Sequence, residues 1–336
     1  MERSLPSRIA DAHNDLLVEL AFRAADDNPF RKYWLEPLRA GGVTLQVCPV
    51  STAFERLPEG ALREALEQVG AFHRALGENP TDLFQVEGRA DLEALRDDGP
   101  IGLILAMEGM EPLGYSPSMA DIFWQLGVRV FGLTWNRRNP FADGIAEPAH
   151  GGLSRLGRQL VARLAELGAL VDLSHASERT FLDVLERNDR NVLVSHAACR
   201  ALCDTPRNLS DEQLRALAEA GGLLGLMVLP PTIDPDDPTI GRVVDHLDHA
   251  VEVMGTEHVC LGADFFRQVA LSGAVRKPPD SLRPPGMGLD YSIDDLSGPE
   301  HLPNLVAVLE ARGYEGDVLD GVLRGNLLRF LGRTLP

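Results

Sequence analysis

Short runs of apolar, often β-branched residues alternate with longer amphipathic stretches along most of the chain. Eight runs are typical of buried strands: Arg8–His13, Val43–Val50, Ile101–Glu108, Val128–Trp135, Leu170–His175, Val192–His196, Leu223–Leu229 and His258–Asp264. Six stretches between them have the period of a surface helix: Glu59–Leu76, Ser118–Leu126, Ser154–Leu167, Glu178–Arg187, Asp211–Ala220 and Arg242–Met254. Nearly continuous apolar strands that alternate with helices indicate a parallel sheet covered on its outer side. Eight such units predict an α/β fold, the closed (β/α)8 TIM barrel.

The 336 residues are expected to form one barrel domain, 1–336, because barrels of this length commonly fold as a single unit. The stretch 265–303 breaks the alternation of strands and helices. It contains Pro278-Pro279 and Pro284-Pro285, so we expect a long, irregular loop after the eighth strand. Such a loop would lie on the same side as the other strand ends, where loops often serve function.

Potential metal ligands stand at the ends of five of the eight predicted strands. They are His13, Asp15, Glu108, His175, His196 and Asp264. In a (β/α)8 barrel the C-terminal strand ends form one face, so these side chains are expected to meet there. Imidazole and carboxylate groups are ligands for zinc, and for iron or manganese as well.

Each of these residues also has a simpler interpretation. His13 and Asp15 are two apart on a predicted strand and so share a face, but such a pair alone is a weak signal. Glu108 ends an apolar strand, where a carboxylate is costly to bury unless it binds a metal or forms a salt bridge. His175 and His196 could each be hydrogen-bonded core residues. Asp264 could accept a proton from an attacking water or serve only as a metal ligand, and the two roles are compatible.

Charge and hydropathy narrow the possible partners. The 50 acidic and 32 basic residues give a formal net charge of -18, which repels phosphate backbones, so nucleic acid is not expected to bind. No apolar run reaches the roughly 20 residues needed to cross a bilayer, and Met1–Ala10 has no segment typical of a signal peptide. We therefore expect a cytoplasmic protein without membrane contact. Its four cysteines lack a CxxC pair and are expected to be reduced thiols.

The ordered set of motifs resembles the renal (membrane) dipeptidase family, zinc-dependent metallopeptidases of the amidohydrolase-like barrel group. The motifs cover nearly the whole chain: Asp-Ala-His-Asn-Asp (11–15), Leu38-Arg-Ala-Gly-Gly-Val with Gln46, Met107-Glu-Gly, Leu133-Thr with Pro140-Phe-Ala-Asp143, Gly152-Leu-Ser with Gly157, Val171-Asp-Leu-Ser-His-Ala-Ser177, Ser195-His-Ala with Cys203, Pro206-Arg-Asn-Leu-Ser-Asp211, Leu261-Gly-Ala-Asp264 and Gly325-Asn-Leu-Leu-Arg329. Each motif is modest, but the ordered set is specific.

This resemblance implies a binuclear centre of two divalent metal ions, with zinc as the expected metal. His13 and Asp15 would hold one ion, His175 and His196 would hold the other, and Glu108 would bridge the two. The implied reaction is hydrolysis of the amide bond of small dipeptides by a metal-activated water. The family often accepts a D-configured C-terminal residue, and it also suggests a homodimer.

Two further roles follow from the same resemblance. Asp264 would handle the proton of the attacking water. Arg207 would receive the free carboxylate of the dipeptide, a role that suits a guanidinium group because it binds carboxylates bidentately and stays charged. The simpler interpretation of Arg207 is a surface arginine after a proline turn.

The chain departs from the family pattern at two places. Trp135 stands where the family has a histidine after Leu-Thr; tryptophan donates one N–H and adds an apolar wall but cannot act as an imidazolium. The residues that could supply the missing charge are Arg137, Arg138 and Asn139. After Asp264 the chain continues with Phe266 where the family often has an aspartate. Both changes leave open a hydrolase of another amide, lactam or ester on the same metal site, or a catalytically weak binding or accessory protein.

Overall fold

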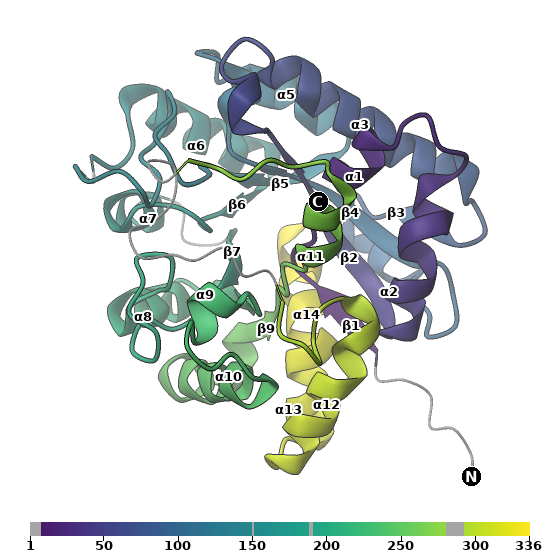
Figure 1. The fold of residues 1–336 in the computed structure, drawn as a ribbon. Helices are drawn as coiled ribbons and strands as arrows, with labels where there is room; N and C mark the ends of the chain where they lie inside the picture. Colours follow the sequence, from purple (N-terminus) through teal and green to yellow (C-terminus); the bar gives the residue numbers. More distant parts are fainter. Residues whose placement is uncertain (1–7, 150, 188–190, 280–291) are drawn as a thin grey trace.

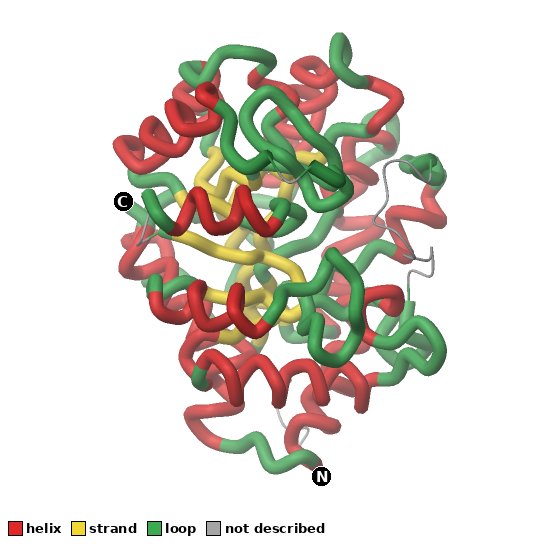
Figure 2. Tube along the Cα trace, turned by 90° about the vertical axis from the view of Figure 1, so that its left-hand side faces the viewer, coloured by secondary structure: helices red, strands yellow, loops and turns green. Residues whose placement is uncertain are grey.

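Eight parallel strands pair edge to edge in a closed ring, with helices outside them (Figure 1, Figure 2). The computed structural model describes residues 8–149, 151–187, 191–279 and 292–336. The ring consists of β1 (Ile9–Asp11), β2 (Val43–Ser51), β4 (Ile101–Glu108), β5 (Val128–Gly132), β6 (Leu170–Asp172), β7 (Val192–Ala197), β8 (Leu223–Leu226) and β9 (Val259–Leu261). Each strand pairs with the next, and β9 pairs with β1 to close the ring. The predicted (β/α)8 barrel is therefore confirmed.

A ninth short strand, β3 (Leu83–Gln85), was not predicted. It pairs with the first residues of β4, where Leu83 lies opposite Ile101, and leaves the rest of that edge to β5. β3 therefore extends the sheet beside the barrel without entering the ring.

The helices that surround the barrel follow the strands in chain order. They are α1 (Leu16–Phe22), α2 (Glu36–Ala40), α3 (Ala61–Glu78), α4 (Arg89–Leu92), α5 (Met119–Gln125), α6 (Arg155–Leu167), α7 (Glu178–Leu185), α8 (Asp211–Glu219), α9 (Pro230–Ile233), α10 (Ile240–Met254), α11 (Arg267–Ser272), α12 (Leu302–Ala311), α13 (Gly316–Asp320) and α14 (Asn326–Thr334). The six predicted amphipathic stretches correspond to α3, α5, α6, α7, α8 and α10. Ser210, for example, caps α8 by accepting a hydrogen bond from the backbone N–H of Gln213.

The end of the barrel where the strands begin is filled with apolar side chains. Inward-facing residues near the strand starts, such as Leu45, Leu170 and Leu223, form one buried cluster with Leu327 and Phe330 of α14. The side-chain amide of Asn326 anchors this helix by donating to the carbonyl oxygens of Thr256 and Val259. The C-terminal helix thus closes one end of the barrel, and the predicted ligand residues gather at the other end.

Several strands end earlier than the sequence predicts. β1 stops at Asp11, β6 at Asp172 and β9 at Leu261, so His13, His175 and Asp264 lie in the turns that follow them. His175 and Asp264 have φ angles of 62° and 57°. This left-handed conformation is incompatible with a strand and uncommon outside glycine. It turns both side chains into the mouth of the barrel, and such backbone strain is often found at functional sites.

The expectation of one long irregular loop over 265–303 is partly wrong. The segment contains the helix α11 directly after Phe266, and α12 begins within it at Leu302. Residues 280–291, which include Pro284-Pro285, lie outside the described residues. In the part of the chain that the structure describes, no helix combines the length and apolar character needed to cross a membrane. The four cysteines are buried and form no disulfide.

Candidate metal centre

Half of the predicted ligand set surrounds the Nε2 atom of His13. This nitrogen lies 3.7 Å from Asp15 Oδ1, 3.8 Å from Asp264 Oδ1 and 3.9 Å from Glu108 Oε1. Neither His13 Nε2 nor Asp15 Oδ1 has a hydrogen-bond partner among the described residues, although both atoms are buried. We call His13, Asp15 and Asp264 the acid-rich half of the site. Its buried and unpaired ligand atoms fit a metal ion.

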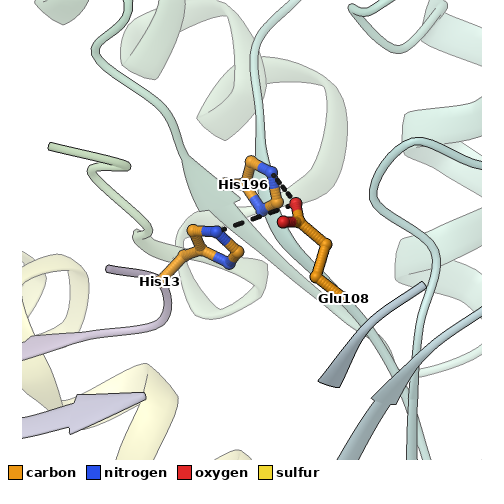
Figure 3. A group of neighbouring side chains, drawn as sticks. All are labelled: His13, Glu108 and His196. Carbon is orange, nitrogen blue, oxygen red and sulfur yellow. Dashed lines mark ion pairs between the residues drawn. The ribbon is translucent and has the colours of Figure 1, made fainter. Parts of the chain in front are cut away.

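The other half consists of two histidines, His175 in the turn after β6 and His196 in the neighbouring strand β7. The Nε2 atoms of His175 and His196 are 2.9 Å apart and lie 2.9 Å and 3.4 Å from Glu108 Oε1. Figure 3 shows His13 and His196 next to each other, with the Glu108 carboxylate opposite both rings. We call His175 and His196 the histidine-rich half. Glu108 contacts both halves, as the sequence predicts for a bridging ligand.

The hydrogen-bonding pattern of His175 shows which of its nitrogens is free to bind a metal. Its Nδ1 lies 2.7 Å from the side-chain oxygen of Asn136, an acceptor, so Nδ1 carries the hydrogen and Nε2 carries a lone pair. Nε2 in turn accepts from Arg207 Nη2 at 3.1 Å. Burial, followed by the charge of Arg207, lowers the pKa of His175 to about 4, so the ring is neutral at pH 7. A neutral imidazole with a free Nε2 beside a carboxylate suits a divalent ion.

The acid-rich half has the opposite electrostatics. Burial alone would lower the pKa of His13, but its contact with Asp15 and the charges of Glu108 and Asp264 raise that pKa to about 10. Burial also raises the pKa of Asp264 to about 7; the charges of Asp15 and Glu108 add to this effect and the His13 charge opposes it. Crowded carboxylates beside a protonated histidine indicate a site that needs positive charge.

A cavity of about 180 Å³ opens above the ligand cluster. Its wall is largely apolar, with side chains such as Phe54, Trp135, Met227 and Phe266. The centre of the Trp135 ring lies 6.2 Å from that of His175. The buried Arg207 also lines this cavity, so both residues that the sequence predicts for substrate binding lie beside the ligand cluster.

The residues expected to compensate for Trp135 do not line this cavity among the described residues. Arg137 pairs with Glu111 at 3.4 Å, and Arg138 pairs with Asp143. The side-chain amide of Asn139 donates to the backbone at Leu133. Each is held by local partners, so none replaces the missing histidine.

Sequence reasoning missed the residues that hold the histidines in place. Asn136 accepts a hydrogen bond from His175, and the hydroxyl of Ser195 lies between His13 and His196. The only signal in the sequence was a serine directly before each of the two strand-end histidines, in Ser174-His175 and Ser195-His196. Serine is too common for this repetition to indicate a role without the structure.

Known proteins resemble this chain along most of its length. The family model for membrane dipeptidase (peptidase family M19) matches residues 5–273. Dipeptidase aclJ of Aspergillus oryzae is 32% identical over 278 residues, 81% of this chain and 61% of the relative. Human dipeptidase 3 is 30% identical over 345 residues, 97% of this chain and 64% of the relative. The chain thus spans less than two thirds of the length of these two curated relatives.

Solved structures share the fold. A metallo peptidase from Rhodobacter sphaeroides, liganded with a phosphinate mimic of the dipeptide L-Ala-D-Ala, has a TM-score of 0.86 and 23% identity, over 98% of this chain and 99% of that one. Dipeptidase AC, a metallo peptidase of family M19, has a TM-score of 0.85 and 24% identity, over 99% of both chains. Because the family model covers most of the sequence, the chain belongs to the membrane dipeptidase family, peptidase family M19.

Proposed function

We propose that this protein is a metal-dependent dipeptidase with two divalent ions, natively zinc, at the mouth of its barrel. The observation that carries the proposal is the convergence of buried ligand atoms from both halves of the site on Glu108. In this proposal His13 and Asp15 hold one ion, His175 and His196 hold the other, and Glu108 serves both. The names of the relatives, which are dipeptidases, support the same activity.

The ions would supply Lewis acidity, which polarises an amide carbonyl and activates water near neutral pH. We assign the proton of that water to Asp264, because its carboxyl group lies 3.8 Å from His13 Nε2 and lines the cavity. Two cations beside Asp264 would lower its raised pKa and keep it ionised at pH 7. It could then pass the proton to the leaving amine.

Arg207 is the group proposed to bind the free carboxylate of the substrate. It is only 4% exposed, and burial lowers its pKa, but a guanidinium remains charged at neutral pH. Its Nη2 now donates to His175 Nε2, the lone pair that a metal would use. A metal and an N–H group cannot share that lone pair, so metal binding would free the guanidinium for a carboxylate.

The apolar wall of the cavity points to dipeptides with small apolar side chains. Trp135, Phe54 and Phe266 provide surface for such groups and no charge to recognise a polar one. A cavity of about 180 Å³ limits their size. The L-Ala-D-Ala mimic bound to the Rhodobacter sphaeroides structure of the same fold is a ligand of this class and supports the choice.

A panel of L-L and L-D dipeptides tests this proposal with zinc-loaded and metal-free protein. Only the zinc-loaded protein should turn over substrates such as alanyl-alanine. Arg207→Ala should raise KM by about 10-fold or more, because a hydrogen bond to a charged group contributes about 1.5–3 kcal/mol. Arg276→Ala is the matched control, since Arg276 lines the same cavity but is 80% exposed and paired with Glu55. An equal effect of the two substitutions would contradict the role of Arg207.

A second candidate function keeps the metal centre and changes the substrate. Trp135 in place of the family's histidine enlarges the apolar wall, which favours N-acylated amino acids, lactams or esters over free dipeptides. The same panel, extended to N-acetylated and cyclic analogues, separates the two functions. Faster turnover of the blocked compounds would replace the dipeptidase proposal with this one.

A further inference from the structure

His13 and His196 belong to opposite halves of the metal centre but share one hydrogen-bond partner. The hydroxyl oxygen of Ser195 lies 3.3 Å from His13 Nδ1 and 2.8 Å from His196 Nδ1. The two imidazole rings stack above this hydroxyl, with centroids 3.6 Å apart. Each ring directs its Nε2 toward Glu108. One serine therefore contacts the Nδ1 atom of a proposed metal ligand in each half, on the side of the ring away from Nε2.

The hydrogens in this network can be placed one by one. The Ser195 Oγ atom lies 2.5 Å from Asp172 Oδ2. The other atoms bound to the Asp172 carboxyl group are donors as well: the backbone N–H groups of Ser174 and Ser195 and the hydroxyl of Ser174. Asp172 is thus an acceptor throughout, and Ser195 donates its single hydrogen to it.

With its hydrogen committed, Ser195 can only accept from the two rings. A hydroxyl has two acceptor lone pairs, which match the two Nδ1 atoms that contact it. Ser174 Oγ also lies 3.1 Å away, but its single hydrogen goes to Asp172. Both Nδ1 atoms must then carry hydrogens, which leaves the Nε2 atoms of His13 and His196 with the lone pairs that bind a metal.

A local irregularity of β7 brings Ser195 and His196 to the same side of the sheet. Neighbouring residues of a regular strand point to opposite faces, but the register of β7 against β8 shifts between Val194 and Ala197, as in a β-bulge. The carbonyl oxygen of Ser195 packs against Gly225 and Gly262, where any Cβ atom would overlap with it. The position of Ser195 is therefore accommodated by β8, which contains Gly225, and by the segment after β9, which begins with Gly262.

We propose that Ser195, oriented by Asp172, is a positioning residue that fixes the metal-binding tautomer of one histidine in each half of the centre. This inference rests on the proposed metal centre but not on the identity of its substrate. Its consequence is specific: loss of the Ser195 hydroxyl should weaken binding of both ions together. Loss of the Asn136 side chain, which is hydrogen-bonded to the proposed ligand His175, should weaken binding in the histidine-rich half alone.

The test measures zinc affinity and histidine tautomers in the full-length protein. Ser195→Ala should bind both zinc ions about 10–100-fold more weakly in competition with a chelator, the usual effect of losing a partner of a metal-bound histidine. In ¹⁵N spectra of histidine-labelled, zinc-loaded wild type, both His13 and His196 should have a protonated Nδ1 and a metal-bound Nε2. Either ring with its hydrogen on Nε2 overturns the proposal, and this wild-type measurement does not depend on the folding of any variant.

Ser174→Ala is the matched control. Ser174 is also buried and donates to the same Asp172 carboxylate, and its hydroxyl oxygen lies 3.1 Å from that of Ser195. It accepts from the backbone N–H of His196 but contacts neither ring of the two histidines. It should keep the wild-type tautomers and affinities. If Ser195→Ala and Ser174→Ala weaken zinc binding equally, the serine acts only through the stability of the network and the proposal is wrong.

Asp172→Asn tests the direction of the hydrogens. An asparagine amide can donate to Ser195 Oγ, which would force the hydroxyl hydrogen toward one Nδ1 and move that ring's own hydrogen to Nε2. We expect a changed tautomer together with weaker zinc binding, and an unchanged pair of tautomers would overturn the role of Asp172. A wild-type protein that binds no divalent ion would overturn the metal centre and this proposal together. Two ions bound with unchanged affinity by Ser195→Ala would overturn this proposal alone.

Discussion

The two halves of the candidate metal centre use the same residue type in opposite electrostatic settings. In the acid-rich half, three carboxylates lie within 3.9 Å of His13 Nε2 and raise the pKa of this histidine to about 10 against the effect of burial. In the histidine-rich half, burial and the charge of Arg207 lower the pKa of His175 to about 4. At neutral pH His13 in the metal-free site therefore carries an extra proton, whereas His175 is already the neutral imidazole that a metal binds.

The buried ligand side chains are thus stabilised in the absence of metal in two different ways. His13 does so by holding a proton, which offsets the charge of Asp15 and Asp264. His175 does so by accepting a hydrogen bond from Arg207 at the nitrogen that a metal would occupy. Metal binding should therefore release a proton from the first half and an arginine from the second.

The largest expected effect comes from Glu108, the residue that contacts both halves. Glu108→Gln keeps the size of the side chain but removes the shared negative charge, so zinc content should fall in both halves at once. Turnover should drop by more than about 100-fold, because loss of a residue that is merely hydrogen-bonded to a metal ligand already costs up to that much. Metal analysis and kinetics measure the two effects.

Glu111→Gln is the control for Glu108, because Glu111 is also buried but pairs with Arg137 outside the ligand cluster. It should retain both ions and normal turnover. A Glu108→Gln variant that keeps two zinc ions would show that the two halves do not depend on a common ligand.

Asp264→Asn should separate chemistry from metal binding in the acid-rich half. The variant loses the carboxylate that takes the proton, so kcat should fall by about 10²–10⁴-fold, the usual contribution of a general base. KM should change far less, because Arg207 is untouched. Steady-state kinetics at a fixed zinc content measure the split, and a variant that fails only through lost metal would assign Asp264 to binding instead.

Zinc affinity should depend on pH mainly through the acid-rich half. His13 has a raised pKa of about 10, so below pH 10 a metal must displace its proton, and affinity should fall about tenfold for each pH unit lost. His175, with a pKa of about 4, should add no such dependence above pH 4. Calorimetry at pH 8 in buffers of different ionisation enthalpy should detect about one proton released per chain. Binding without proton release would contradict the charge assigned to His13.

The smallest effect is expected from Trp135, which lies beside the histidine-rich half. Trp135→His would add a polar group and remove apolar wall, so preference should shift from N-acylated substrates toward free dipeptides. We expect the ratio of kcat/KM values for the two classes to change by about tenfold. Trp124 is not among the described residues that line the cavity, so Trp124→His is a suitable control and should leave the ratio unchanged. A shift of the ratio toward N-acylated substrates in Trp135→His would contradict this role of Trp135.

The fold could be predicted because each barrel strand is a buried apolar run, and Glu108 shows why the candidate ligands could be picked out from the sequence. A carboxylate at the end of such a run is too costly to bury without a partner. The three-residue β3 has too little pattern to recognise. The helices of the C-terminal segment, including α14, were also missed. The homodimer and the cytoplasmic location remain predictions.

The finer geometry of the site could not be read from sequence. Histidine and aspartate adopt the left-handed region more often than most residue types, but too rarely for the sequence to indicate it at His175 and Asp264. The role of Ser195 depends on an irregularity of β7 and on space left by Gly225 and Gly262, which belong to other segments. Local sequence indicates the candidate ligands, whereas packing between distant segments decides which residues surround them.

The most direct measurement is a zinc titration of metal-free protein, followed by the rate of dipeptide hydrolysis. We expect no turnover without zinc, and a rate that reaches its maximum at two ions per chain. Turnover that persists in the chelated protein would contradict a metal-dependent dipeptidase. A rate that stays at zero with two ions bound would mean that the centre acts on another substrate.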